Sequence, residues 1–342
     1  MDYFQQLLAI SNMHKFVLDN IGQFRLICKA QNLMALFSTT HAIQSQAFCL
    51  PGRRLGQHSS DNPPIFSRIR LMPCQCSHNG HVASPVERCA EGSESKLIDG
   101  LLLSMDNPSA IISDIAVGSH FIGVRAEDNG SACVGLASTL GAVPTVEERS
   151  MVDDLIGKPL CEAAEELKEP GAFSISLGAA ALNAGMIPPQ NQPNIEASRI
   201  MAEKGKNEET VLVGDFPFTG WLRGQVKALH LFELKKVGGG TPPEQWDDIL
   251  GRCKVLGLTG TTLITRAMAT YLEKSTQAYT IVIGPTTPMS PVLFSHGADV
   301  LAGCQVVAPD PVFAGIRKGM SFRELKKLGI RFIAWSKNPV AG

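Results

Sequence analysis

Two stretches of sequence decide the fold: Val255-Leu-Gly-Leu-Thr-Gly-Thr-Thr262 and Tyr279-Thr-Ile-Val-Ile-Gly-Pro-Thr-Thr-Pro-Met-Ser-Pro291. Each begins with a short apolar run, and near-continuous apolar runs are typical of parallel strands that are buried on both faces. Each run then ends in a polar turn that contains glycine. Open α/β sheets bind their ligands at the carboxyl ends of the strands. These two turns therefore mark the functional edge that we predict for this protein.

Strand and helix patterns alternate on both sides of these stretches. Between Val211 and Trp335 we predict six strands joined by short helices, including a helix over Leu263–Lys274. Such alternation indicates the α/β class and predicts a Rossmann-like, doubly wound parallel sheet with right-handed crossovers. We assign residues 211–337 to this domain.

A smaller α+β domain is predicted over residues 94–190. Three strand patterns lie within 110–137, and Glu127-Asp-Asn-Gly130 between the last two is a hairpin turn of the Asn-Gly type. Helical patterns follow, and the last of them spans Phe173–Ala184. Strands followed by helices predict a meander that helices cover on one face. Residues 191–210 are predicted to be a linker between the two domains.

Composition limits the classes of function. The chain has 342 residues, is 44% hydrophobic and 18% charged, and carries a formal net charge of −1. This charge balance gives no reason to expect a nucleic-acid partner, and no apolar run reaches the roughly 18 residues of a membrane span. The four cysteines beyond residue 93 stand singly in apolar surroundings. Because free buried cysteine behaves as a small hydrophobe, we expect reduced thiols and a cytoplasmic location.

Residues 1–93 differ from the rest of the chain. The first 90 residues hold eight Lys/Arg and four Asp/Glu, a charge of +4, and the segments rich in Pro, Ser and Gly show no sustained period. We expect a poorly ordered leader. An acid-poor segment with Ser and Arg resembles an organellar transit peptide. A plain extension and a misassigned start codon are the alternatives.

One cluster of metal-ligand residues lies in this leader. Cys74, Cys76, His78 and His81 offer the thiol and imidazole groups that zinc and copper prefer. Their spacing matches no common zinc module, whose paired ligands are separated by a finger. Direct metal binding and a flexible segment that happens to contain these residues both stay open, and the latter is favoured.

The first turn of the large domain lacks the dinucleotide fingerprint. Gly214-Asp-Phe-Pro-Phe218 stands where G-x-G-x-x-G would be, and its bulky residues would obstruct a pyrophosphate. Glu233 lies 18 residues after Asp215 near the end of the second strand, where an acid commonly binds ribose hydroxyls. Thr261 or Thr262 is a candidate cap for the helix after the third strand. The loop from Gly284 to Pro291 carries three prolines that fix its backbone, which favours a rigid ligand cradle.

The segment from about Lys96 to Lys337 resembles the family known as putative heavy-metal chelation proteins, formerly a domain of unknown function. The resemblance is carried by Gly214-x-Phe-Pro-Phe218, Leu231-Phe-Glu-Leu234, Thr259-Gly-Thr-Thr-Leu263, Gly284-Pro-Thr-Thr-Pro-Met-Ser-Pro-Val-Leu-Phe294 and Gly297-Ala-Asp-Val-Leu-Ala-Gly303. It implies an enolase N-terminal-like domain followed by a Rossmann-like domain, with the site in the cleft between them. It also implies a role with metal-chelating, pterin-like or flavin-like small molecules.

Two functional hypotheses follow. In the first, the protein is an enzyme that performs condensation or hydrolysis on such a small molecule, and the catalytic candidates are Glu233, Asp215 and Asn183. In the second, it binds a metal complex or an adenosine-like ligand without turnover. A metal ion or an S-adenosylmethionine-like ligand is the candidate cofactor, and a homodimer is compatible with either hypothesis. The predicted ligand-binding residues are Arg125, Gly214, Thr259, Gly260, Thr261, Thr262, Gly284, Pro285, Thr286, Thr287 and Ser290.

Overall fold

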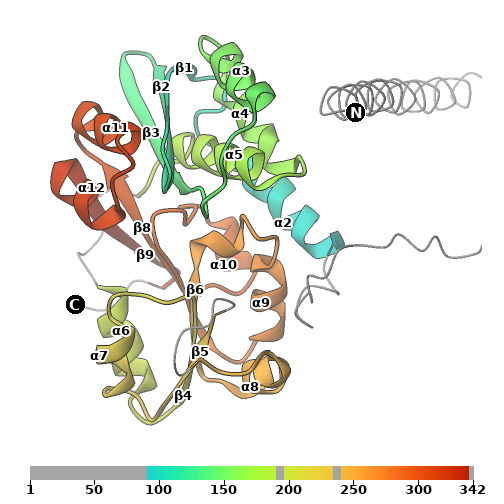
Figure 1. Cartoon of the computed structure of the whole chain (residues 1–342). Coiled ribbons are helices and arrows are strands. Elements are labelled where there is room, and N and C mark those ends of the chain that lie inside the picture. The colour runs from blue at the N-terminus through green and yellow to red at the C-terminus, as the bar shows by residue number, and fades with distance from the viewer. Residues whose placement is uncertain (1–90, 190–195, 234–239, 339–342) are drawn as a thin grey trace, which may run out of the picture. The chain divides into compact units, whose positions relative to one another are not determined.

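Two β-sheets organise the chain, one of three strands and one of six (Figure 1). The computed structural model describes residues 91–189, 196–233 and 240–338, all of which belong to one compact unit. We call residues 91–189 the N-domain and residues 196–338 the C-domain. The predicted cluster from Cys74 to His81 and almost all of the predicted leader lie outside the described residues.

The N-domain begins with helix α2 (Glu91–Leu103), which the antiparallel strands β1 (Ile111–Val117), β2 (Phe121–Asp128) and β3 (Ser131–Ser138) follow. The hairpin predicted between β2 and β3 is confirmed. Asn129 and Gly130 both have positive φ, 48° and 79°. A two-residue type I′ turn requires positive φ at both positions, and its twist matches that of the strands.

Helices α3 (Val146–Leu155), α4 (Leu160–Ala164) and α5 (Ala172–Ala184) and the short 3₁₀ helix η2 (Glu165–Lys168) complete the N-domain. The predicted helix over Phe173–Ala184 is thus confirmed as α5. This helix packs directly on β2 and β3. A Cβ at Gly135 of β3 would overlap the backbone of α5, so a residue without a side chain permits the close contact.

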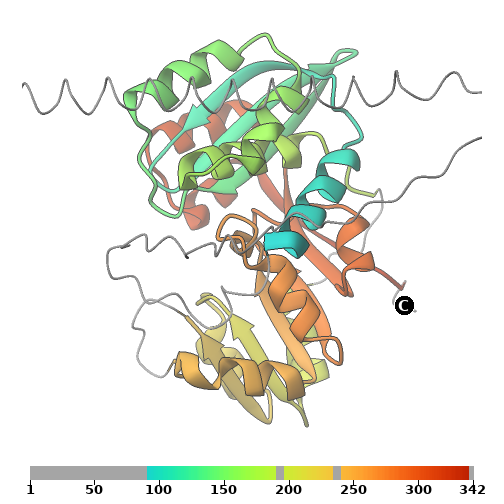
Figure 2. The ribbon, with the colours of Figure 1, turned by 90° about the vertical axis from the view of Figure 1, so that its right-hand side faces the viewer.

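The second face of the three-stranded sheet is also covered, which corrects the prediction of helices on one face only. Helix α11 (Pro309–Arg317) belongs to the C-domain and packs against β1 and β2 (Figures 1 and 2). Helix α12 (Phe322–Gly329) packs on α11. Ion pairs from Arg125 to Asp310 and from Arg317 to Asp114 join this helix to the sheet. The C-domain therefore supplies one of the two layers that enclose the N-domain sheet.

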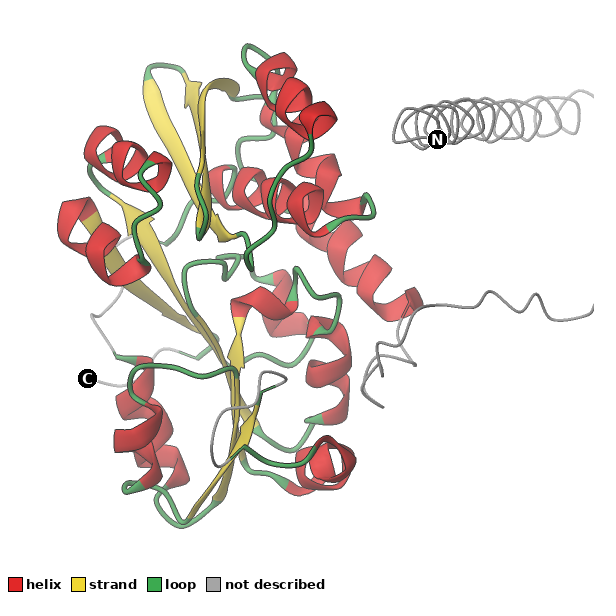
Figure 3. Ribbon diagram, viewed as in Figure 1, coloured by secondary structure: helices red, strands yellow, loops and turns green. Residues whose placement is uncertain are grey.

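The C-domain sheet, whose strands are yellow in Figure 3, has the strand order β5-β4-β6-β7-β8-β9. Its first five strands are parallel, as predicted, but β9 runs antiparallel to β8. Two helices, α11 and α12, separate β8 from β9, instead of the single crossover helix of a right-handed parallel unit. The strands are β4 (Glu209–Val213), β5 (Ala228–Phe232), β6 (Val255–Thr259), β7 (Tyr279–Ile283), β8 (Val300–Val306) and β9 (Ile330–Ser336).

Helices cover both faces of this sheet, as a doubly wound fold requires. Helices α6 (Ala197–Gly205) and α7 (Thr219–Arg223) pack with one apolar cluster, and α8 (Trp246–Arg252) and α9 (Met268–Lys274) pack with the other. The predicted linker thus contains α6 and the start of β4. The predicted helix from Leu263 begins only at Met268, because Arg266 adopts a left-handed backbone with φ of 57°. The shorter elements are η3 (Pro243–Gln245), η4 (Gly260–Thr262) and α10 (Val292–Ser295).

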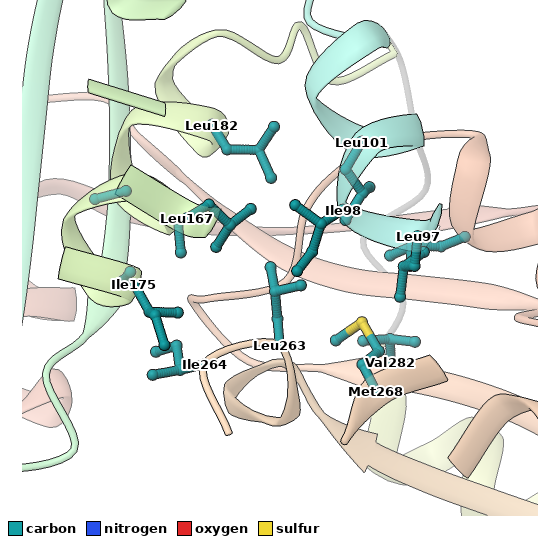
Figure 4. Packing of buried hydrophobic residues seen from close by; sticks show 14 of the residues in the cluster. Leu97, Ile98, Leu101, Leu167, Ile175, Leu182, Leu263, Ile264, Met268 and Val282 are labelled. Atoms are coloured by element: carbon teal, nitrogen blue, oxygen red, sulfur yellow. The ribbon is translucent and has the colours of Figure 1, made fainter. Parts of the chain in front are cut away.

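A large apolar cluster contains buried residues of both domains (Figure 4). Leu97, Ile98 and Leu101 of α2 are at most 2% exposed. They lie between buried side chains of the N-domain, such as Leu182, and buried side chains of the C-domain, such as Leu263 (Figure 4). Burying each such side chain contributes about 1.5–3 kcal/mol, so α2 is part of the contact between the domains. In the described ranges no helix is long and apolar enough to cross a membrane.

Candidate functional site

The predicted loop from Gly284 to Pro291 lies at the contact between the two domains. It leaves β7 at Gly284, where φ of 116° turns the chain, and the Gly284 N–H donates to Ala302 O at 2.9 Å. The hydroxyl-bearing residues are buried: Thr286 is 0%, Thr287 3% and Ser290 0% exposed. The hydroxyls of the loop therefore face protein rather than open solvent.

Two of these three hydroxyls connect the domains. Thr286 Oγ1 accepts a hydrogen bond from the backbone N–H of Ser138, at the end of β3, over 3.0 Å. Ser290 Oγ lies 2.7 Å from Ser104 Oγ, just after α2, and accepts from Val292 N–H. These bonds hold the N-domain on the loop. Thr287 Oγ1, in contrast, is buried and has no hydrogen-bond partner in the described part of the chain.

Asn183 stands beside this loop at the end of α5. Its Nδ2 donates to Leu136 O at 2.9 Å and to Thr286 O at 3.3 Å, which fixes the orientation of the amide. Its Oδ1 is buried and, within the described residues, has no hydrogen-bond partner. An unsatisfied buried acceptor costs about 1–3 kcal/mol. Asn183 Oδ1 and Thr287 Oγ1 are thus two buried polar atoms without a partner in the described part of the chain.

A cavity of about 390 Å³ lies between the domains at this place. This volume is within the range of small-molecule sites. Its walls come from β3, from the end of α5 and the segment after it, from the loop after β7, and from β8. The lining residues are Asn107, Ser131, Ala132, Cys133, Val134, Gly135, Leu136, Asn183, Ala184, Met186, Ile187, Pro188, Pro285, Thr287, Met289, Cys304, Gln305 and Val306.

The cavity wall is polar but carries no charged side chain among these described residues. The two thiols are held in the neutral form. Burial raises the pKa of Cys133, whose Sγ accepts a hydrogen bond from Asn107 at 3.4 Å. Burial also raises the pKa of Cys304 to about 12. General acid–base catalysis needs a group that titrates near the working pH, and this wall supplies none.

The same wall does not fit a bare metal ion. Hard cations take carboxylate and carbonyl oxygens, and soft cations take several thiolates or imidazoles, whereas the described lining has no carboxylate or imidazole and two thiols, those of Cys133 and Cys304. Within the described ranges, no cluster of three or more His, Cys, Asp or Glu side chains is arranged to hold a metal.

A second group of predicted residues gathers at the carboxyl ends of β4, β5 and β6. The backbone N–H of Asp215 donates to Glu233 Oε2 at 3.3 Å, so these two acids are adjacent. Gly214 has φ of 93°, and a Cβ built on it would lie 3.3 Å from the Thr259 side chain. Strand order reverses between β4 and β6, and such switch points are where doubly wound sheets bind ligands. These residues are not among those that line the 390 Å³ cavity.

The turn after β6 lies between the residues at the carboxyl ends of β4 to β6 and the loop after β7 that lines the cavity. Thr259 caps η4 by accepting from Thr261 N–H, so the predicted cap at Thr261 or Thr262 is wrong. Thr262 Oγ1 instead donates back to Thr259 O at 2.7 Å. A Cβ on Gly260 would lie 2.6 Å from Thr287 N. Gly260 thus lets this turn pack directly against the backbone of the Thr287 loop.

The remaining polar candidate of the N-domain has a structural contact. Arg125 Nη1 pairs with Asp310 Oδ1 at 2.8 Å, and Arg125 is not one of the cavity-lining residues. Of the predicted site residues, the cavity brings together Asn183, Pro285 and Thr287. Sequence reasoning missed the backbone of β3 and the sulfur-bearing lining residues, since apolar strand and loop residues carry no chemical signal of their own.

The fold and this cavity define a class: a two-sheet α/β protein with a cavity between its domains. Two family models match, over residues 98–186 and 196–334, and both carry the description "Putative heavy-metal chelation". The chain belongs to this family. A comparison with curated proteins finds no similar sequence.

Solved structures share the fold. A DUF364-family protein of unknown function from Desulfitobacterium hafniense DCB-2 superposes with a TM-score of 0.63 at 22% identity, covering 72% of this chain and 100% of its own. A DUF364-family protein of unknown function from Pyrococcus horikoshii has a TM-score of 0.58 at 17% identity, covering 70% and 98%. At such identities the likeness describes the fold alone.

Proposed function

We propose that the protein binds a small, uncharged, polar organic molecule in the cavity between the domains, without chemical turnover. One observation carries this proposal: Thr287 and Asn183 line the cavity, and each has a buried oxygen, Thr287 Oγ1 and Asn183 Oδ1, without a partner in the described part of the chain. Folded proteins rarely leave such atoms unpaired. A ligand that donates a hydrogen bond to each would remove the cost.

The family description suggests the kind of ligand. The cavity has no donor set for a free metal ion, so the proposal agrees with heavy-metal chelation only if the metal arrives inside an organic chelator. A metallophore or a pterin- or flavin-like precursor of one would meet both conditions. The neutral wall supports binding over catalysis, because the acids Asp215 and Glu233 are not among the lining residues.

Thr287→Val tests the proposal. Valine has nearly the shape of threonine, so the change removes the hydroxyl and little else. We expect the variant to lose an organic mass that co-purifies with the wild-type protein. We also expect the ligand-free variant to be as stable as the wild type or up to about 1–2 kcal/mol more stable, since an unsatisfied buried hydroxyl is removed.

Thr270→Val is the matched control. Thr270 Oγ1 is also buried and unpartnered within the described residues, but Thr270 lies in α9 and does not line the cavity. Native mass spectrometry of the full chain, purified without chelators, would compare wild type and both variants, with elemental analysis of each sample. A bound mass that survives in Thr287→Val as well as in Thr270→Val would contradict the proposal.

A further inference from the structure

One wall of the cavity is the unpaired edge of a β-sheet. In the N-domain sheet the strand order is β1-β2-β3, so β3 pairs on one side only, with β2. The stretch Ser131–Leu136 of β3 lines the cavity. An unpaired strand edge presents a row of backbone N–H and C=O groups that can bind another molecule.

The hairpin turn determines which groups point into the cavity. A two-residue turn at Asn129 and Gly130 makes Asp128 and Ser131 a hydrogen-bonded pair. Bonded and non-bonded pairs then alternate along the antiparallel ladder. The backbone groups of every second residue therefore point away from β2, and these residues are Ala132, Val134, Leu136 and Ser138.

Two observed hydrogen bonds agree with this assignment. The Leu136 carbonyl accepts from Asn183 Nδ2, and the Ser138 N–H donates to Thr286 Oγ1. Both groups are among those that the register directs away from β2. The end of the β3 edge is thus capped by protein side chains, whereas the stretch before it, around Val134, borders the cavity.

The part of the edge that has no partner among the described residues alternates acceptors and donors: Ala132 C=O, Val134 N–H, Val134 C=O and Leu136 N–H. We propose that this edge recognises a ligand that presents an amide C=O and an amide N–H side by side, the C=O accepting from Val134 N–H and the N–H donating to a neighbouring carbonyl of β3. The inference rests on the proposed function, since it specifies the chemistry of the ligand bound in that cavity. Such pairing repeats the hydrogen bonds that a further strand would make.

The rest of the described lining fits the same ligand. It includes Thr287 and Asn183, each with one buried oxygen that has no partner among the described residues, and it carries no charged side chain. A neutral amide needs no counter-ion, whereas a carboxylate or ammonium ligand would be buried without one, at high cost. A C=O and an N–H lie side by side in a ring lactam, whose amide is cis, and along one edge of an open-chain peptide, where they come from two successive trans amides.

The Val134 backbone N–H is the direct probe. Full-length protein labelled with ¹⁵N at valine would be titrated with uracil, a ring lactam, and with N-acetylglycine N-methylamide, an open-chain amide. We expect one of the two to shift the Val134 amide resonance and slow its hydrogen exchange, and the responding probe identifies the geometry. Val124 lies in β2, paired on both sides, and its amide exchange should not change.

Val134→Pro and Val134→Ala form a matched pair of variants. Proline removes the N–H from an edge strand, where that group is not needed for pairing with β2, and alanine removes the same side-chain packing but keeps the N–H. We expect the responding probe to bind roughly tenfold or more weakly to the proline variant than to the alanine variant. If the proline variant does not fold, the exchange measurement on the wild-type protein decides.

The outcomes separate the two proposals. Equal binding to the proline and alanine variants, or no response of Val134 to either probe at millimolar concentration, would overturn recognition by the β3 edge. If Thr287→Val still loses the co-purified mass in that case, the cavity remains the ligand site and only the amide chemistry fails. If Thr287→Val keeps that mass as well, the proposed function fails too.

Discussion

The most informative perturbation of the fold is Glu94→Gln in helix α2. Glu94 is 4% exposed, and its Oε2 accepts from the N–H of Ala269, at the start of α9, over 2.8 Å. Its Oε1 is buried and, in the described ranges, unpartnered. Burial, opposed by the Ala269 hydrogen bond and by Arg266, raises the pKa of Glu94 from 4.5 to about 7.

Because the pKa of Glu94 is raised, ionisation of this carboxyl destabilises the folded protein. A raised pKa means that the folded state binds a proton more tightly than the unfolded state does. The free energy of unfolding therefore falls as pH rises from about 4.5 to about 7 and is level above that range. At roughly 1.4 kcal/mol for each pH unit, the difference between the two pKa values comes to about 3 kcal/mol, as an upper figure.

Glutamine cannot ionise, and its oxygen can still accept from Ala269 N–H. We expect Glu94→Gln to match the wild type near pH 5 and to exceed it near pH 8 by up to about 3 kcal/mol. Urea denaturation followed by tryptophan fluorescence at a series of pH values measures this difference. The reasoning would be refuted if the free energies of unfolding of wild type and variant changed in parallel between pH 5 and pH 8.

Glu324→Gln is the control for this experiment. Glu324 is the capping-box residue of α12, and hydrogen bonds from the Ser321 hydroxyl and backbone lower its pKa. A lowered pKa contributes stability that is present above the unfolded pKa and lost as pH falls through the folded pKa. The control variant should therefore be less stable than the wild type by a constant amount between pH 5 and pH 8, with the same pH dependence there, and the difference should close in acid.

Two further predictions concern the contacts between layers. Gly135→Ala should lower the free energy of unfolding by roughly 2–3 kcal/mol or prevent folding, because its Cβ would overlap the backbone of α5; a melting temperature within one degree of the wild type would contradict this. Arg125→Ala should cost less than about 1 kcal/mol despite the short ion pair, because Asp310 is 89% exposed and its charge is screened, and a double-mutant cycle with Asp310→Ala measures the coupling.

Local patterns predicted the elements well where the deciding residues are neighbours in sequence. The Asn-Gly turn specified the β2–β3 hairpin, and the apolar runs located β6 and β7. Helix α11 was missed because Pro309 and Pro311 interrupt a helical pattern. In the structure both prolines lie in the first turn, where a missing N–H costs no hydrogen bond.

Features that depend on distant residues could not be predicted. Glu94 and its partner Ala269 are 175 residues apart, so the sequence offers no sign that this glutamate is buried. The antiparallel direction of β9 likewise depends on how α11 and α12 pack on the N-domain sheet. Composition and spacing describe a chain locally, whereas burial and strand direction are properties of the folded whole.

The loop from Gly284 to Pro291 shows why the site was only partly predictable. Rigid backbone and several hydroxyls are the signature of a ligand cradle, but they equally suit a joint between two domains. Thr286 and Ser290 serve as that joint, because each hydroxyl has a partner in or next to the N-domain. The two uses differ only in what each hydroxyl bonds to. Thr287 Oγ1 has no hydrogen-bond partner in the described chain, and Thr287 lines the cavity. Since both domains form its walls, we expect a ligand bound in that cavity to stabilise the contact between the domains.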